Sequence, residues 1–253
     1  MEWIQVTKEN LAQEHICCAL TNDADCQVLA KKAWLAQRFD DGLVFLKGNV
    51  RGKCFIEYLP AERAWAPIEA DGYLYIDCLW VAGKYQKQGY ARQLLEQCIA
   101  DGKAKRRKGL VILSAKKKKP FLADAQFLLH HGFAVCDTAG PDFALMYAPF
   151  ADNGPIPQFK PQVKQPVELQ SGFVLYYSHQ CPFTAKYVPL LAAIAEARHV
   201  PLQVRQFCTA EQAQAAPTPF TAFSLFYNGQ FITHEILSEK RFGKLLEEKG
   251  WCR

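Results

Sequence analysis

The sequence predicts a mixed α/β protein built from two folding units in succession. Half of its 253 residues are hydrophobic, which is enough for a core in each unit. Residues 151–166 hold four prolines and a glycine without apolar periodicity, so we expect a linker there. On both sides of it, short apolar runs alternate with amphipathic stretches, which is the pattern of strands and helices. We therefore expect units at residues 1–150 and 167–253.

Composition excludes several classes of protein. The chain is 13% aromatic and 22% charged, values that exclude a disordered or a collagen-like protein. No apolar run approaches the ~18 residues of a membrane span, and residues 1–9 are too polar for a signal peptide, so we expect a cytoplasmic protein without a membrane partner. The ten cysteines are irregularly spaced without a C-x-x-C pair, which favours reduced thiols and gives no zinc or other metal site.

The first unit is predicted to begin with two helices and to continue with alternating strands and helices. Amphipathic spacing predicts helices at residues 10–20 and 25–39, and aromatic and β-branched residues predict a central strand at 73–81. The other predicted elements are strands at 43–46, 54–59, 110–115, 133–135 and 143–148, and helices at 89–103 and 122–131.

The second unit has the predicted order β, α, β, hairpin, α. Asn228 and Gly229 lie between two apolar runs and are the strongest hairpin signal in the chain. The predicted elements are a strand at 173–177, a helix that ends near 197, strands at 202–207, 223–227 and 230–234, and a helix at 239–249.

A loop that fits a phosphate follows the predicted central strand. Leu79, Trp80 and Val81 end the strand, and a tight loop then leads to Gly89 and Ala91 at the start of a helix. These two small residues let the backbone approach a ligand closely, and the first helical turn has N–H groups without intrahelical acceptors. A pyrophosphate fits such a loop. A plain strand-to-helix turn is the alternative interpretation of a lone Gly-x-Ala pair.

The same run resembles motif A of the GNAT superfamily, the acyl-CoA-dependent N-acyltransferases. The family signature is Q/R-x-x-G-x-G/A after a strand written L-x-V. Gln86, Gly89 and Ala91 match the signature, and residues 79–81 match the strand. The His-Gly-Phe run at 131–133 is similar to the end of the family's motif B.

This resemblance implies a GNAT acyltransferase fold, with a mixed sheet that splays at the central strand, and acetyl-CoA as the cosubstrate. Pantetheine would pair with the backbone of Leu79, Trp80 and Val81. The acceptor would be an amine on a small molecule or a peptide. Backbone amides of the loop would hold the pyrophosphate, from Gln86, Lys87, Gln88, Gly89, Tyr90 and Ala91.

Two carboxylates are candidates for the general base. Asp77 lies two residues before Leu79, so strand alternation predicts that both side chains share one face. A carboxylate in a largely apolar strand tends to have a raised pKa, which suits proton abstraction. Glu57, on the preceding strand, is the second candidate, and a structural pair between Asp77 and a lysine is the alternative. A backbone N–H near Trp80 or Val81 would stabilise the oxyanion.

The proton donor departs from the family pattern. Motif B commonly has a tyrosine four residues before its glycine and an asparagine seven residues before that tyrosine. This sequence has Leu128 and Phe121 at those positions. We therefore expect Tyr147, Tyr85 or solvent to protonate the leaving thiolate.

Nine of the seventeen residues at 103–119 are Lys or Arg. A solvated surface is the first interpretation of such a run. Attraction of the CoA phosphates is the second. Nucleic-acid binding is the third, because residues 116–119 lack interleaved aromatic side chains.

Cys181 in the second unit is a candidate redox thiol. It follows a predicted strand and opens a helix, and Pro189 lies eight residues later, an arrangement that resembles the thioredoxin-like fold. Because a helix N-terminus favours the thiolate, we expect Cys181 to be partly exposed and to ionise below ~8.5. Thr184 stands at the position of a resolving cysteine, so Cys208 is the alternative partner. A scaffold without redox chemistry is the other interpretation.

The whole chain resembles the YoaP family of bacterial acetyltransferases, through the runs KKKKPFLADAQFLLHHGF and FSLFYNGQFITHEIL. The resemblance implies an N-acetyltransferase in which the second unit positions the acceptor. One alternative is a redox or binding protein that uses Cys181, with a first unit that only holds CoA. Another is a basic interaction protein without catalysis.

Overall fold

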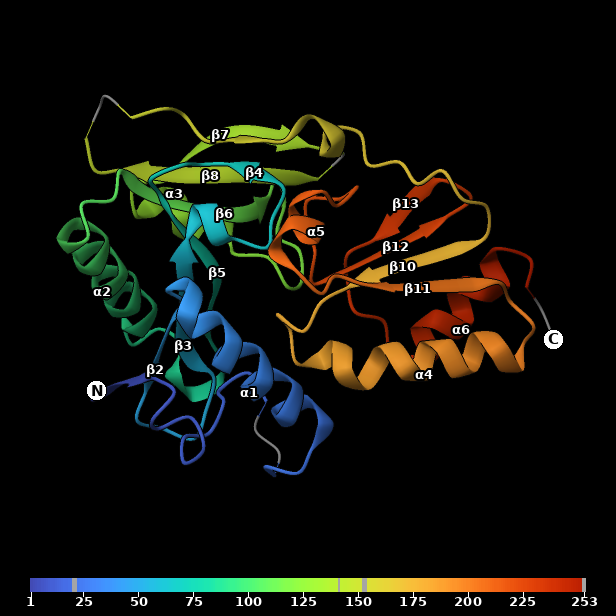
Figure 1. Ribbon diagram of the computed structural model, residues 1–253, viewed down its shortest axis with the longest axis horizontal. Coiled ribbons are helices and arrows are strands. Elements are labelled where there is room, and N and C mark those ends of the chain that lie inside the picture. The colour runs from blue at the N-terminus through green and yellow to red at the C-terminus, as the bar shows by residue number, and fades with distance from the viewer. Residues whose placement is uncertain (20–21, 141, 152–153, 252–253) are drawn as a thin grey trace.

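Seven strands of the first unit form one mixed sheet in the order β1-β2-β3-β5-β6-β8-β7 (Figure 1). The computed structural model describes residues 1–19, 22–140, 142–151 and 154–251. Only β5 and β6 are parallel neighbours, and the other adjacent pairs are antiparallel. The strands are Trp3–Val6 (β1), Val44–Gly48 (β2), Cys54–Pro60 (β3), Leu74–Val81 (β5), Gly109–Ala115 (β6), Ala134–Ala139 (β7) and Phe143–Pro149 (β8).

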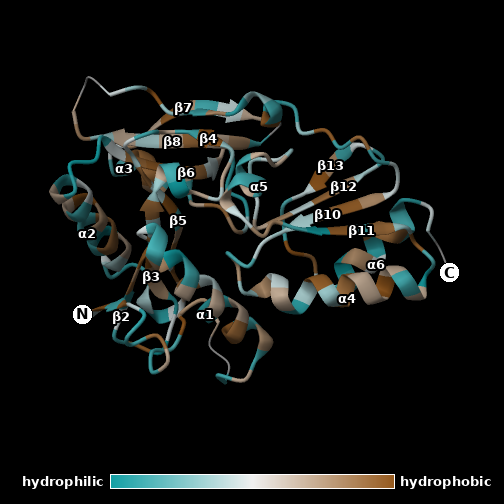
Figure 2. Ribbon diagram, viewed as in Figure 1, coloured by the Kyte–Doolittle hydropathy of each residue, from teal (hydrophilic) through white to brown (hydrophobic). Residues whose placement is uncertain are grey.

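Helices cover both faces of this sheet. Helix α1 (Cys26–Arg38) begins after Asp25, whose side chain accepts a hydrogen bond from the backbone N–H of Gln27. It packs Trp34 and Leu35 on one face, together with aromatic residues of β2 and β3. Helices α2 (Tyr90–Ala104) and α3 (Ala125–His130) pack their apolar residues on the opposite face. Figure 2 shows hydrophobic residues along the central strands, whereas α2 carries both kinds of residue.

The central strands β5 and β6 separate part of the way along. They pair only from Leu74 to Ile76 on β5, opposite Leu110 to Ile112 on β6. Strand β5 then continues to Val81 without a partner on that side, within the described part of the chain. The sheet therefore opens at the carboxyl end of β5, as the predicted splay requires.

The second unit is built around a four-stranded sheet in the order β11-β10-β12-β13. Strands β10 and β11 are parallel, and the remaining pairs are antiparallel. Helices α4 and α6 pack together on one face of this sheet. Its elements are Phe173–Tyr177 (β10), Phe183–Ala197 (α4), Leu202–Gln206 (β11), Ala210–Gln214 (α5), Phe223–Tyr227 (β12), Gln230–Thr233 (β13) and Glu239–Glu248 (α6).

The two units share one hydrophobic core. The face of the second sheet that is not covered by α4 contributes Tyr176 and Phe226 to the cluster that contains Trp65 and Phe143 of the first unit. The segment predicted as a linker takes part in this contact, since its strand β9 (Gln158–Phe159) pairs with β4 (Ile68–Glu69). Phe159 and Val163 of the same segment are fully buried. The units are therefore held together by packing as well as by the chain.

The predicted elements agree with the structure except near the amino terminus and at a few ends. Residues 10–19 form turns instead of the predicted helix, and residue 20 lies outside the described residues. Asn10 explains the turn, because its side chain accepts from the N–H of Thr7 and donates to the carbonyl of Gln5. Strands β1, β4 and β9 and helix α5 are additional elements, and α3 is shorter than expected. Within the described residues, no helix has the length and apolar composition needed to cross a bilayer.

Candidate active site

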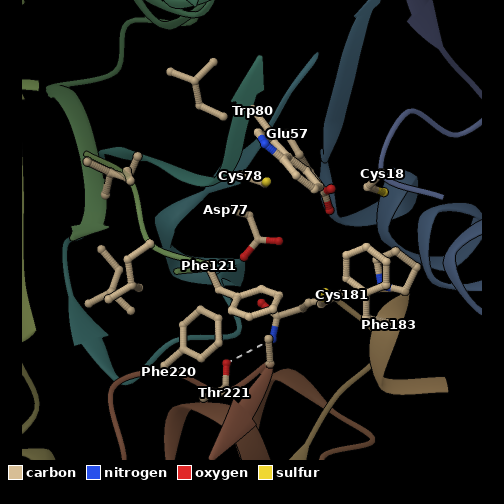
Figure 3. A pocket seen from close by; sticks show the side chains of 18 of the residues that line it. Cys18, Glu57, Asp77, Cys78, Trp80, Phe121, Cys181, Phe183, Phe220 and Thr221 are labelled. Atoms are coloured by element: carbon tan, nitrogen blue, oxygen red, sulfur yellow. Dashed lines mark hydrogen bonds between the residues drawn. The ribbon is translucent and has the colours of Figure 1, made fainter. Parts of the chain in front are cut away.

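A cavity of about 450 Å³ lies where β5 and β6 separate, and residues of both units line it (Figure 3). The first unit contributes charged and apolar side chains from α1, β3, β5 and β6 and from the loop before α3. The second unit contributes two loops, 180–183 before α4 and 219–222 before β12. The opening in the first sheet is thus closed by the second unit, and two regions far apart in sequence form one site.

A buried ion pair lies in this cavity. The Nζ of Lys31 donates to both carboxylate oxygens of Glu57, at 2.8 and 2.7 Å, and to the carbonyl oxygen of Gln180 at 2.6 Å. Both charged side chains are 1% exposed. The indole N–H of Trp34 donates to Glu57 at 3.3 Å. Burial is the largest single effect on Lys31 and disfavours the ammonium. The charge of Glu57, its hydrogen bond and the smaller effects of Cys18 and Asp77 together outweigh burial and raise the pKa of Lys31. The pair joins α1 and β3 to the second unit through the bond of Lys31 to Gln180.

Asp77 lies beside this pair, on a β-bulge. Glu57 pairs with Cys78 and Tyr58 pairs with Ile76, so Asp77 has no partner across the β3–β5 ladder. The bulge reverses the alternation of side chains, and Leu79 packs on the α2 side while Asp77 faces Glu57. The prediction that strand alternation puts Asp77 and Leu79 on one face is therefore wrong, although both residues line the cavity.

The pKa of Asp77 is raised from its ordinary value of 3.8 to about 7. Burial is the largest cause, and the negative charge of Glu57 and a hydrogen bond with it add to the rise. The charge of Lys31 lowers the pKa of Asp77, but this ammonium is paired with Glu57 and not with Asp77. A carboxyl group with a pKa near neutrality can both take up and release a proton at pH 7.

Three thiols lie around the carboxylates, namely Cys18, Cys78 and Cys181 (Figure 3). Burial raises the pKa of each of them, and the pKa of Cys181 reaches about 11. The N–H of Phe183 and the charge of Lys31 favour the Cys181 thiolate, but burial and the carboxylates oppose it. The prediction that Cys181 ionises below ~8.5 is therefore wrong. Thr184, at the resolving position, is buried and donates to backbone carbonyls.

The rate of alkylation at neutral pH should depend on how exposed each thiol is and should be slowed at Cys181 by its raised pKa. We expect Cys26 and Cys208, which are exposed, to react with iodoacetamide before Cys181, which is partly buried and has a raised pKa. Peptide mapping by mass spectrometry after timed labelling measures the order. Faster labelling of Cys181 than of Cys208 would restore the redox interpretation.

The predicted phosphate loop connects β5 to α2 in an anion-binding conformation. Gly89 precedes the first helical residue with a φ of 77°, and Lys87 also has a positive φ, of 60°. In the part of the chain that the structure describes, the N–H groups of residues 87–92 donate to no backbone carbonyl. The first turn of α2 contains no acidic residue. These N–H groups and the positive end of the helix are thus free to bind an anion.

The structure places the predicted proton donors outside the cavity. Tyr147 packs against Tyr73, with ring centroids 6.4 Å apart, and does not line the cavity. Tyr85 packs on Gly52 and lines a separate pocket beside the amino terminus. The cavity is lined instead by Tyr75, and burial raises the pKa of this phenol well above its ordinary value, so that it stays protonated.

The structure also shows where the two residues that depart from motif B, Leu128 and Phe121, lie. Leu128 is fully buried in the core beneath α2 and α3. Phe121 lines the cavity and is 43% exposed. Neither side chain can donate a proton, and of the two only Phe121 lies at the cavity.

The basic stretch at residues 103–119 does not form one patch. Strand β6 divides it into one group at the end of α2 and another, residues 116–119, at the opposite end of the strand. Several of its side chains are in ion pairs, such as Lys105 with Asp101 and Lys119 with Asp142. This division favours a solvated surface, with only residues 116–119 at the end of the sheet that carries the phosphate loop.

Comparisons with known proteins identify the family of the chain. Residues 9–133 match the family described as "Acetyltransferase (GNAT) family", and residues 201–244 match "YoaP-like". The uncharacterized N-acetyltransferase YoaP of Bacillus subtilis (strain 168) is 44% identical over 247 residues, which cover 97% of this chain and 98% of that protein.

Two solved structures are similar to part of the chain. YncA from Salmonella typhimurium, solved with acetyl-CoA, is 17% identical and has a TM-score of 0.43, over 61% of this chain and 96% of that one. The ribosomal-protein-alanine N-acetyltransferase of Brucella melitensis is 18% identical with a TM-score of 0.42, over 59% of this chain and its own full length. The full-length match to YoaP decides the assignment, and the chain belongs to the YoaP family of GNAT N-acetyltransferases.

Proposed function

We propose that this N-acetyltransferase moves the acetyl group of acetyl-CoA to an amine bound in the cavity between the two units, with Asp77 as the general base. The observation that carries the proposal is the position of Asp77. It lies at the point where β5 leaves β6, inside the cavity, with a pKa of about 7.

Two features support acetyl-CoA as the donor. Beyond Ile76, the edge of β5 toward β6 is unpaired in the described structure and offers backbone groups of Leu79, Trp80 and Val81 to pantetheine. The free N–H groups of residues 87–92 then lie where the pyrophosphate would follow. Residues Gln86 to Ala91 would hold it through the backbone, and Lys87 would add a positive charge.

The reaction exchanges one bond for another. The amine nitrogen attacks the thioester carbonyl, the C–N bond forms, and the C–S bond breaks to release the CoA thiolate. Asp77 accepts the proton that the nitrogen loses, while Glu57 remains paired with Lys31. A backbone N–H near Trp80 or Val81 would stabilise the oxyanion, and Tyr75 is our candidate to protonate the thiolate.

We further propose that residues 167–253 are a thioredoxin-like domain that serves as the wall of the acceptor site, after a GNAT domain at 1–150 and a connecting segment at 151–166. The order β11-β10-β12-β13 and the β, α, β, hairpin, α sequence support this fold. The raised pKa of Cys181 favours a scaffold over a redox domain. The location in the cytoplasm remains a prediction from the sequence.

The phosphate loop gives a direct test of the proposal. Gly89→Glu should weaken acetyl-CoA binding by at least ~100-fold, because a carboxylate would lie beside the pyrophosphate. Gly89→Gln is the matched control, since it has the same size and the same strained backbone at a φ of 77° without the charge. An added Cβ meets no atom closer than 4.0 Å, so both variants have room to fold. Calorimetric titration with acetyl-CoA measures the affinities, and equal binding by a folded Gly89→Glu protein would contradict the proposed site.

A further inference from the structure

The charges of the cavity limit what the acceptor can carry. Lys31 is the single cationic side chain among the described residues that line the cavity. Its three N–H bonds are used by the two oxygens of Glu57 and by the carbonyl of Gln180. Lys53 lies beside the rings of Trp80 and Phe183 but does not line the cavity. Among the lining residues, no positive group is left for a carboxylate or phosphate of the acceptor, and the Asp77 carboxylate would repel one.

The polar groups contributed by the second unit are also occupied. The side-chain amide of Gln180 donates to Ser178 at 2.7 Å and to Thr221 at 2.9 Å, and the latter bond is visible in Figure 3. The hydroxyl of Thr221 in turn donates to the carbonyl of Trp65. An acceptor rich in hydroxyl or amide groups would therefore lose hydrogen bonds to water and find few replacements here.

Aromatic rings form much of the remaining surface of the cavity. They come from both units and surround the carboxylates in Figure 3. Their faces attract cations, as Lys53 shows, since its ammonium lies 4.0 Å from the Trp80 ring centroid and 5.7 Å from that of Phe183. The rings that line the cavity belong to Phe55, Tyr75, Trp80, Phe121, Phe183 and Phe220.

We infer that the acceptor is a small primary amine on an apolar body without a carboxylate, of the arylalkylamine type. This inference rests on the proposed acetyl transfer at the same site. The neutral amino group lies beside Asp77, which accepts its proton during the transfer, and the apolar body packs on the aromatic rings that line the cavity.

The size of the cavity agrees with a compact acceptor. Its volume of about 450 Å³ is in the lower half of the range of roughly 300–1,000 Å³ found for small-molecule sites, and the acetyl group shares this space. A peptide would bring amide groups that the occupied side chains of Gln180 and Thr221 do not satisfy. A small amine is therefore favoured over a protein terminus.

The test compares amines that differ in one feature. Phenethylamine and phenylalanine share the ring and the amino group, but only phenylalanine carries a carboxylate. Glucosamine presents an amine on a hydroxylated body, and a short peptide presents an α-amine with amides. With the full-length protein and acetyl-CoA, we expect kcat/KM for phenethylamine to exceed that for phenylalanine by about 100-fold and the others by at least about 10-fold, with each acetylated product measured by mass spectrometry.

Two variants of Phe220 test the contribution of the aromatic rings that line the cavity. Phe220→Ala should raise the KM for phenethylamine about 10-fold and leave the Kd for acetyl-CoA unchanged, whereas Phe220→Leu should have a smaller effect because it keeps an apolar surface. Equal or faster acetylation of phenylalanine, glucosamine or the peptide would overturn this inference and leave the acetyl transfer standing. Binding of acetyl-CoA without turnover of any of these amines would also overturn it. Failure to bind acetyl-CoA would instead overturn the proposed function.

Discussion

Asp77→Asn is expected to lower kcat by about 10²- to 10⁴-fold while the affinity for acetyl-CoA stays within about twofold of the wild-type value. The amide has nearly the shape of the carboxylate and can still donate a hydrogen bond to Glu57, but it cannot accept the proton of the amine. Acetyl-CoA binds through the loop at residues 86–91 and the edge of β5, so its affinity should not depend on this side chain.

The pH dependence of the reaction should identify Asp77 as the group that titrates. A base acts in its deprotonated form, and the pKa of Asp77 is about 7. For the wild type, kcat/KM should therefore rise with pH through about 7 and level off above it. In Asp77→Asn, the remaining activity should lack this inflection. Retention of the same inflection in the variant would assign it to another group.

The same substitution should make the fold more stable at high pH. The pKa of Asp77 is raised from 3.8 to about 7, so the folded state binds this proton more tightly than the unfolded state does. The contribution of Asp77 to stability is therefore lost as the pH rises from about 4 to 7. Since each pKa unit corresponds to about 1.4 kcal/mol, the Asn variant should gain up to roughly 4 kcal/mol at pH 8 and little at pH 4. Lower stability with normal activity per folded molecule would show a structural carboxylate.

Local patterns predicted much of both units. The strand that contains Asp77 and the loop that contains Gly89 depend on apolar spacing and on small residues, which are visible in a short window. Strand β10 begins and ends at the predicted residues 173–177. The hairpin at Asn228 and Gly229 forms as expected because its turn residues favour positive φ.

The site itself depends on contacts that no short window contains. Lys31 is one of several charged residues on an amphipathic helix, and it bonds Gln180, which lies 149 positions later. The bulge at Asp77 is a shift of register between two strands, which alternation along one strand cannot predict. The raised pKa of Cys181 likewise results from burial, to which the charges of Asp77 and Glu57 in the other unit add, and these effects outweigh the N–H of Phe183 at the start of the helix.

The surroundings of the candidate base explain why one carboxylate is charged and the other is near neutral. Two carboxylates in one buried site repel each other, so a single cation can stabilise only one of them fully. Lys31 makes two hydrogen bonds to Glu57 and none to Asp77 within the described structure. Lys31 therefore compensates Glu57, and Asp77, without a cation of its own, has the raised pKa that the proposed base requires.

Lys31→Met is expected to lower the free energy of unfolding by about 3–5 kcal/mol, because it leaves the carboxylate of Glu57 buried without its cation. The substitution also removes the bond to the carbonyl of Gln180 and with it a contact between the two units. Lys32→Met, at the next position of the same helix, is the matched control. Its partner Asp23 is 80% exposed, so its loss should cost at most about 1 kcal/mol.

The double variant Lys31→Met, Glu57→Leu distinguishes the cost of an unpaired buried charge from the cost of lost side-chain contacts. If the loss in Lys31→Met comes from an unpaired buried charge, replacing Glu57 by a similar apolar side chain should restore most of the stability. Urea unfolding curves of the three variants and the wild type measure the differences. A double variant as unstable as Lys31→Met would contradict this account and assign the loss to the apolar stem of Lys31 and to the contact with Gln180. Recovery of stability without recovery of acetyl transfer would show that the buried pair serves the chemistry of Asp77 rather than the fold.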